Sequence, residues 1–186
     1  RVLAGGQSLL AMLNLRLLSP TVLVDITRIP ELGSIREVDG HIEVGAAVTQ
    51  NRLMAWPQLA AKVPLLAAAL PFVGHFQTRN KGTVCGSIAH ADPSSEIPLS
   101  LATLEGEVVL RSKRGARVLP AAEFQRDMLS TACASDELIV AVGFPVPRKA
   151  AARSCWRRST RGSTRTPETP STSTSAARTP WRPGSP

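Results

Sequence analysis

The sequence has 186 residues, with 22 Lys and Arg against 14 Asp and Glu, so its formal net charge is +8. This length suits one domain, with or without an appendage, and because no run of about 18 apolar residues occurs, the sequence predicts no membrane-spanning helix. Its three cysteines, an odd number, do not make a disulfide framework, so we expect a reducing, cytoplasmic compartment.

The N-terminal residues predict a strand, a glycine turn and a helix. Residues 2–4 form a short apolar strand that runs into Gly5-Gly6. Leucines recur on one face of residues 9–18, as in an amphipathic helix, and Ser19-Pro20 should end this helix. The apolar residues 22–24 then predict a buried strand.

Turn and capping signals follow in the next part of the chain. Asp39-Gly40, between the strand-like residues 34–38 and 42–45, is typical of a type I′ hairpin, whose two central positions need positive φ. Thr49 predicts the N-cap of a helix that extends to about residue 61 with an interruption near Pro57, and Pro64 predicts the start of another.

The last predicted elements are strands. Residues 107–112 and 116–119 should pair as a second hairpin, and residues 138–144 should form a strand that Pro145 ends. Hairpins therefore coexist with strand–helix–strand stretches. This mixture predicts an α+β fold and not the regular βαβ repeat of a doubly wound nucleotide-binding sheet.

Residues 150–186 differ in composition from everything before them. They hold seven Arg and one acid, Glu168, and therefore +6 of the net charge, and they contain no Val, Ile, Leu, Met or Phe. Because such a segment cannot offset the entropy of ordering, we expect disorder. Three interpretations remain open: a basic arm for nucleic acid or membrane, a solvated linker, or an out-of-frame translation of a GC-rich gene. The abrupt loss of aliphatic residues favours the third.

Two glycine-bearing segments are candidates for a binding site, since the sequence lacks a G-x-G-x-x-G fingerprint, a P-loop and zinc-ligand spacing. The first is residues 4–9 (AGGQSL), between a predicted strand and a predicted helix. Its glycines let the backbone approach a ligand closely, Gln7 and Ser8 add donors, and the helix N-terminus favours an anion. The segment is therefore either a pyrophosphate cradle or an ordinary strand–turn–helix connection.

The second segment, residues 78–98, combines small residues, hydroxyl groups and two acids and has little helical or strand periodicity. Thr83 and Ser87 can donate hydrogen bonds to phosphate, and Glu96 can accept them from ribose hydroxyls. This chemistry also suits a nucleotide cofactor.

Together the segments resemble the FAD-binding subunit, or domain, of the molybdopterin dehydrogenase family, which includes the medium subunit of aerobic carbon monoxide dehydrogenase and the flavin domain of xanthine dehydrogenase. The resemblance covers about residues 1–149 and rests on residues 2–16 (VLAGGQSLLAMLNLR), 24–32 and 77–98, in that order. It implies an FAD-binding fold of the vanillyl-alcohol oxidase and p-cresol methylhydroxylase type, with the family's first strand and helix missing before Arg1 and its C-terminal lobe missing after Pro147.

The resemblance also implies cofactor-binding roles by position. Residues 4–8 match a first pyrophosphate loop with Leu9 beside it, residues 83–87 match a second flavin loop, and Glu96 matches an acid that holds the adenosine ribose. Leu138 or Ile139 matches an apolar residue near the flavin ring. No catalytic or metal-ligating residue is expected. The expected FAD-binding residues are Ala4, Gly5, Gly6, Gln7, Ser8, Leu9, Thr83, Val84, Cys85, Gly86, Ser87, Glu96, Leu138 and Ile139.

Cys85 departs from the family pattern, because it stands where the first glycine of a Gly-Gly pair is usual. If that position needs positive φ or touches phosphate, a side chain there costs about 1 kcal/mol or more. Of the nearby residues only Lys81 would lower the thiol's pKa, so we interpret Cys85 as structural and not reactive.

The implied function is electron transfer. Electrons would pass from a molybdopterin-binding large subunit through a 2Fe-2S small subunit to FAD, and then to NAD or another acceptor, with no nucleic acid as partner. Two alternatives remain: a stand-alone FAD-dependent oxidoreductase of the same fold, and an inactive fragment with a basic nucleic-acid-binding tail.

Overall fold

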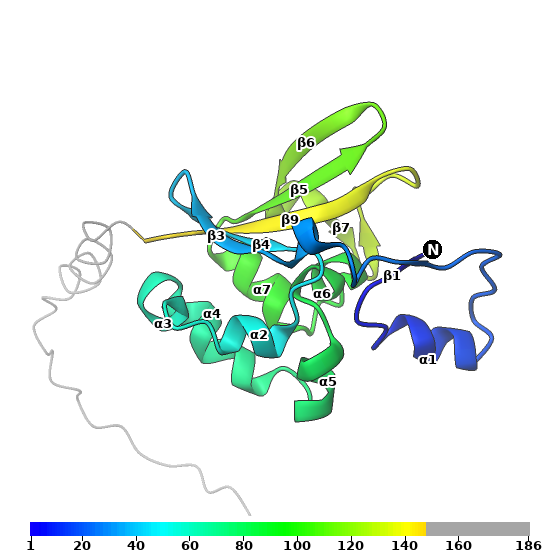
Figure 1. Ribbon diagram of the computed structural model, residues 1–186, viewed down its shortest axis with the longest axis horizontal. Coiled ribbons are helices and arrows are strands. Elements are labelled where there is room, and N and C mark those ends of the chain that lie inside the picture. Colours follow the sequence, from blue (N-terminus) through cyan, green and yellow to red (C-terminus); the bar gives the residue numbers. More distant parts are fainter. Residues whose placement is uncertain (148–186) are drawn as a thin grey trace, which may run out of the picture. The chain divides into compact units, whose positions relative to one another are not determined.

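The structure, a computed structural model, describes residues 1–147 of the chain (Figure 1). The predicted disorder of residues 150–186 lies outside the described residues. No helix within the described part is long and apolar enough to cross a bilayer. The predicted α+β architecture is confirmed, and a five-stranded sheet stands at its centre.

The central sheet is antiparallel and contains both predicted hairpins. Asp39 and Gly40 have φ of 49° and 79°, as a type I′ turn requires, and the second hairpin closes with Ser112 opposite Gly115. The strand predicted from residue 138 lies between the two hairpins and joins them into one sheet. The strand order is β3 (Ile35–Val38), β4 (His41–Gly45), β9 (Leu138–Pro145), β5 (Glu107–Ser112) and β6 (Gly115–Pro120).

Short helices enclose the core against this sheet. Thr49 Oγ1 accepts a hydrogen bond from Arg52 N (3.2 Å) as the predicted N-cap, and Pro64 begins a helix as predicted. Figure 1 shows α2, α4, α6 and α7 on the same side of the sheet, and α6 packs against β4 and β9. The helical elements are η1 (Pro30–Gly33), α2 (Gln50–Met54), α3 (Leu59–Lys62), α4 (Pro64–Ala69), η2 (Leu70–Phe72), α5 (Phe76–Lys81), α6 (Val84–His90), α7 (Glu96–Thr103) and α8 (Ala121–Phe124).

Two N-terminal predictions are wrong in detail. Helix α1 (Leu9–Asn14) ends four residues before residue 18, because Arg16 has a φ of 57° and turns the chain out of the helix. Strand β2 (Val24–Asp25) is not buried, since it pairs with β1 (Val2–Leu3) in a two-stranded parallel sheet and Val24 remains 52% exposed.

The middle segment is more helical than its composition suggested. Residues 78–98 contain the end of α5, all of α6 and the start of α7. Each helix is short, so the 3.6-residue apolar period has little length in which to show. No pattern in the sequence predicted the small antiparallel pair β7 (Gln125–Asp127) and β8 (Ser130–Thr131).

Candidate functional site

The two glycine-bearing segments lie in direct contact. A Cβ added to Gly5 would overlap the carbonyl oxygen of Lys81 and lie 2.6 Å from the Cα of Gly82. Only a residue without a side chain allows two backbones to approach so closely. The contact places the turn before α1 against the turn that leads into α6, so residues far apart in sequence form one junction.

A third segment, the start of α2, completes this junction. Gln50 N donates to Gly82 O (2.9 Å), and Val84 N donates to Val48 O (3.1 Å). A Cβ on Gly82 would lie 3.2 Å from Gln50 Nε2 and 3.4 Å from the Cγ of Gln7, so both amide side chains pack against this glycine. We name the contact of residues 4–9, Gln50 and residues 81–87 the glycine junction.

The start of α6 holds the predicted hydroxyl residues. Thr83 is the N-cap, and its Oγ1 accepts a hydrogen bond from Gly86 N (3.0 Å). Ser87 Oγ lies 3.0 Å from Ser95 Oγ, and Ser95 is the N-cap of α7, which begins at Glu96. The structure therefore brings Thr83, Ser87 and the helix start that carries Glu96 together beside the junction.

Two residues of the second segment turn their side chains into the core. Val84 and Cys85 are 0% and 3% exposed. Cys85 lies in the first turn of α6, so the left-handed backbone that would strain it does not occur, and its Sγ donates weakly to Val44 O (3.5 Å). These side chains can support a ligand-binding backbone but cannot reach a ligand themselves.

Cys85 should resist alkylation in the folded protein. Burial raises the pKa of its thiol, so almost no reactive thiolate is present at neutral pH. Iodoacetamide labelling followed by peptide mass spectrometry measures this, with the partly exposed Cys133 as the internal comparison. Labelling of Cys85 as fast as that of Cys133 would show that the thiol is accessible and would contradict a structural role.

The residues expected near the flavin ring, Leu138 and Ile139, lie on β9 and take no part in the contacts just described. Ile139 is 6% exposed and belongs to the core, whereas Leu138 is half-buried. Their strand packs against α6, which connects them to the second segment. Of the two, Leu138 is the side chain with more surface free to meet a ligand.

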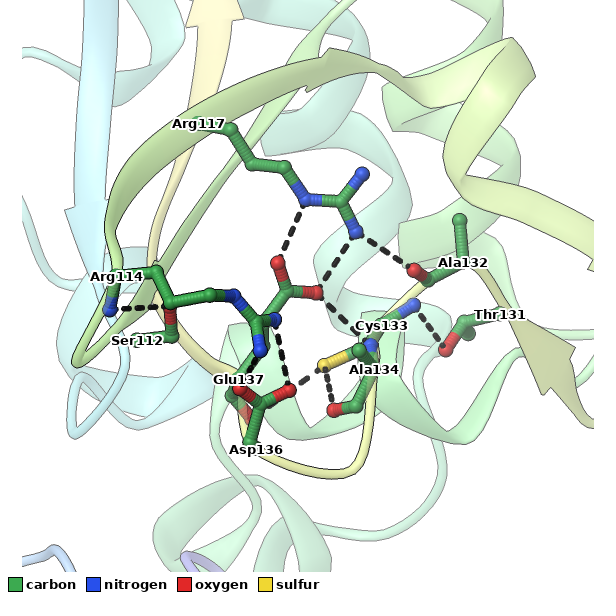
Figure 2. Close-up of polar contacts among 9 residues, drawn as sticks. All are labelled: Ser112, Arg114, Arg117, Thr131, Ala132, Cys133, Ala134, Asp136 and Glu137. Carbon is green, nitrogen blue, oxygen red and sulfur yellow. Dashed lines mark hydrogen bonds and ion pairs between the residues drawn. The ribbon is translucent and has the colours of Figure 1, made fainter.

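A pair of ionised side chains fixes the chain just before β9 (Figure 2). Glu137 accepts hydrogen bonds from Arg117 Nε and Nη2, both at 2.7 Å, and from Ala134 N at 2.8 Å, and its side chain is 7% exposed. These hydrogen bonds lower the pKa of Glu137 to about 2. Arg117 Nη2 also donates to Ala132 O (2.9 Å). The β5–β6 hairpin therefore holds the turn that ends at Leu138, across 20 residues of sequence.

Replacing this acid by Gln should destabilise the fold near neutral pH but not in strong acid. The pKa of Glu137 is about 2 in the folded chain against an ordinary value of 4.5, so its contribution is complete above about pH 4.5 and is lost as the pH falls towards 2. Urea unfolding midpoints of Glu137→Gln across this range measure the effect. The control is Asp136→Asn, which breaks the exposed pair with Arg114 and should change the midpoint less. Equal effects of the two substitutions near neutral pH would contradict this role for Glu137.

Sequence reasoning missed one residue of the junction. Gln50 is 4% exposed, and its Oε1 is buried with no hydrogen-bond partner among the described residues. Buried polar atoms nearly always have a partner, so this acceptor needs an explanation. A Gln directly after an N-cap carries no sequence signal of such a role.

The stretch of sequence that contains Gln50 and residues 81–87 is positively charged. Residues 44–91 contain neither Asp nor Glu. A stretch without acids favours the approach of an anion. Its lysines and arginines are Arg52, Lys62, Arg79 and Lys81.

Comparisons with known proteins point to one group of flavin subunits. Residues 1–147 match the family described as FAD binding domain in molybdopterin dehydrogenase. The chain is 38% identical over 145 residues to the alpha subunit of the 6-hydroxypseudooxynicotine dehydrogenase complex of Paenarthrobacter nicotinovorans, covering 78% of this chain and 49% of that one. It is 39% identical over 145 residues to the carbon monoxide dehydrogenase medium chain of Hydrogenophaga pseudoflava, with 78% and 50% covered.

Solved structures give the same result. Carbon monoxide dehydrogenase of Hydrogenophaga pseudoflava, in a form that lacks the Mo-pyranopterin moiety, matches with a TM-score of 0.77 and 38% identity over 80% of this chain and 52% of that one. Quinoline 2-oxidoreductase of Pseudomonas putida 86 matches with a TM-score of 0.77 and 40% identity over 79% and 52%. The chain thus spans about half the length of the relatives it matches.

Proposed function

Because this chain belongs to the family of FAD-binding domains in molybdopterin dehydrogenases, we propose that it acts as the FAD-binding electron-transfer subunit of a molybdenum hydroxylase. Its cofactor is FAD. Its partners in this proposal are a molybdopterin-binding large subunit and a 2Fe-2S small subunit in the cytoplasm, and NAD or another acceptor takes the electrons. The single observation that supports this site most strongly is the contact of the two glycine-bearing segments at Gly5 and Gly82.

The residues present at the glycine junction fit FAD. Gly5 and Gly82 add no side chain of their own to the junction, residues 44–91 contain no acid that would repel a pyrophosphate, and Gln50 Oε1 is an acceptor that the described residues leave unpaired. In the proposed arrangement residues 4–9 and 83–87 hold the pyrophosphate and Glu96 holds the adenosine ribose. Leu138 or Ile139 contacts the flavin ring.

The chain's own residues bind and orient the cofactor and do not need to transfer protons. FAD, when bound, supplies the redox chemistry. The first acid of the second segment is already engaged in local hydrogen bonds. Asp92 Oδ1 accepts from Ser94 N (2.9 Å) and Ser94 Oγ (2.7 Å), and these hydrogen bonds lower the pKa of Asp92. Asp92 thus orders the connection between α6 and α7, in keeping with a binding site and not with acid–base catalysis.

Anaerobic mixing of the FAD-loaded chain with its reduced 2Fe-2S small subunit tests this function. We expect rapid bleaching of the visible flavin absorbance, which returns when an acceptor such as NAD is added. The chain alone, mixed with candidate hydroxylation substrates, should not bleach. Substrate turnover by the isolated chain would contradict the role of a subunit and would favour a stand-alone oxidoreductase.

A further inference from the structure

Gln50 combines burial with an unsatisfied polar atom. It is the first residue of α2, it is 4% exposed, and Oε1 has no hydrogen-bond partner within residues 1–147. An apolar side chain of similar size would avoid the desolvation that an unpaired amide oxygen suffers. The described residues alone therefore give no reason for an amide at this position.

The backbone around Gln50 fixes where its side chain lies. Gln50 N donates to Gly82 O, and the preceding residue Thr49 bridges to Thr83 across an antiparallel pair. The amide of Gln50 packs against Gly82 with Nε2, on the same glycine that the Cγ of Gln7 contacts. The unsatisfied amide thus lies at the glycine junction, beside Gly82 and next to the side chain of Gln7.

Gln7, which packs against Gly82 together with Gln50, is only loosely held. Gln7 is exposed, and the hydrogen bond recorded for its amide is a single one within its own turn, from Nε2 to Gly5 O (3.1 Å). No recorded side-chain hydrogen bond ties Gln7 to Gln50 within residues 1–147, so a shift of Gln7 would break only the hydrogen bond within its own turn.

We propose that Gln50 is a binding residue of the FAD site and that its Oε1 accepts a hydrogen bond from a sugar hydroxyl next to the pyrophosphate. This inference rests on the proposed function. Phosphate oxygens only accept hydrogen bonds, so the donors nearest to a pyrophosphate held in the junction are the hydroxyls of the ribityl chain and the ribose. Cofactor binding then satisfies an acceptor that is unpaired without it.

Gln50→Met tests the inference, because methionine keeps the length of the side chain and removes its polar atoms. Without FAD, we expect a thermal midpoint equal to or above that of the unchanged protein, since no unpaired acceptor is buried. With FAD, we expect a dissociation constant at least about tenfold higher, as for a lost hydrogen bond in a buried site. Gln58→Met, at an exposed glutamine that precedes α3 and makes no capping hydrogen bond with its side chain, should change neither quantity.

The outcomes separate this inference from the function on which it rests. If the unchanged chain binds no FAD, the proposed function fails. If the unchanged chain binds FAD and Gln50→Met binds it equally well, only the role of Gln50 fails. Loss of stability in the FAD-free state of Gln50→Met, and likewise of Gln50→Leu, would identify Gln50 as a structural residue and would also overturn the inference.

Discussion

Replacing Gly5 by Ala should weaken FAD binding strongly and lower the stability of the chain. The added Cβ would overlap the Lys81 carbonyl oxygen and approach the Gly82 Cα to 2.6 Å, and both are backbone atoms that cannot rotate away. Overpacking of this kind costs about 1–3 kcal/mol, and because the clash separates the two segments, we expect affinity for FAD to fall about a hundredfold. Thermal unfolding and FAD titration of the same preparation measure both effects.

The matched control for this substitution is Gly33→Ala. A Cβ on Gly33 would meet only the end of the flexible Arg52 side chain, at 3.4 Å, and Gly33 has no positive φ. Stability and FAD affinity should therefore stay close to those of the unchanged chain. If Gly5→Ala behaved like Gly33→Ala, the two segments would not be in contact as described.

Replacing Gly86 by Ala should weaken FAD binding with little change in stability. Ala favours a helix over Gly by about 1 kcal/mol, but its Cβ would lie 2.7 Å from Thr83 Oγ1 and displace the N-cap of α6, which costs about as much. The two effects nearly cancel in the free energy of unfolding. Thr83 is 2% exposed and caps α6, so displacing its hydroxyl disturbs the helix start that is proposed to hold the pyrophosphate, and we expect affinity to fall about tenfold.

A double-mutant cycle with Thr83→Ala identifies the cause. Once the hydroxyl is removed, the Gly86→Ala side chain has nothing to displace, so the second substitution should add little to the loss of FAD affinity. Fully additive losses would mean that Gly86 contacts the cofactor independently of Thr83, and they would contradict this explanation.

Local sequence signals predicted much of the fold. Asp39-Gly40 gives its turn because both residues accept positive φ, and Thr49 begins α2 because its hydroxyl caps the helix within three residues. Both features depend on a few neighbouring residues. The burial of β2 was predicted wrongly, since burial depends on what covers a strand and a run of apolar residues does not contain that information.

The candidate site was only partly visible in the sequence for the same reason. Residues 4–9 and 83–87 could be recognised as glycine-bearing sequence motifs. Glycine is needed at position 5, however, because the backbone of residues more than 70 positions away lies against it. Cys85 looked costly while its backbone conformation was unknown, and its place in a helix removes that cost. Gln50 and the pair of Arg117 with Glu137 act through contacts that no local pattern encodes.

The most direct test of the glycine junction as a pyrophosphate site is a titration of the chain with FAD and, in parallel, with riboflavin. Both ligands carry the flavin ring and the ribityl chain, and only FAD carries the pyrophosphate and the adenosine. We expect FAD to saturate a single site and riboflavin to bind at least about a hundredfold more weakly, because the residues proposed to bind the cofactor act mainly on the part that riboflavin lacks. Equal affinity for the two ligands, or no saturable binding of FAD by the folded chain, would contradict a pyrophosphate site at the glycine junction.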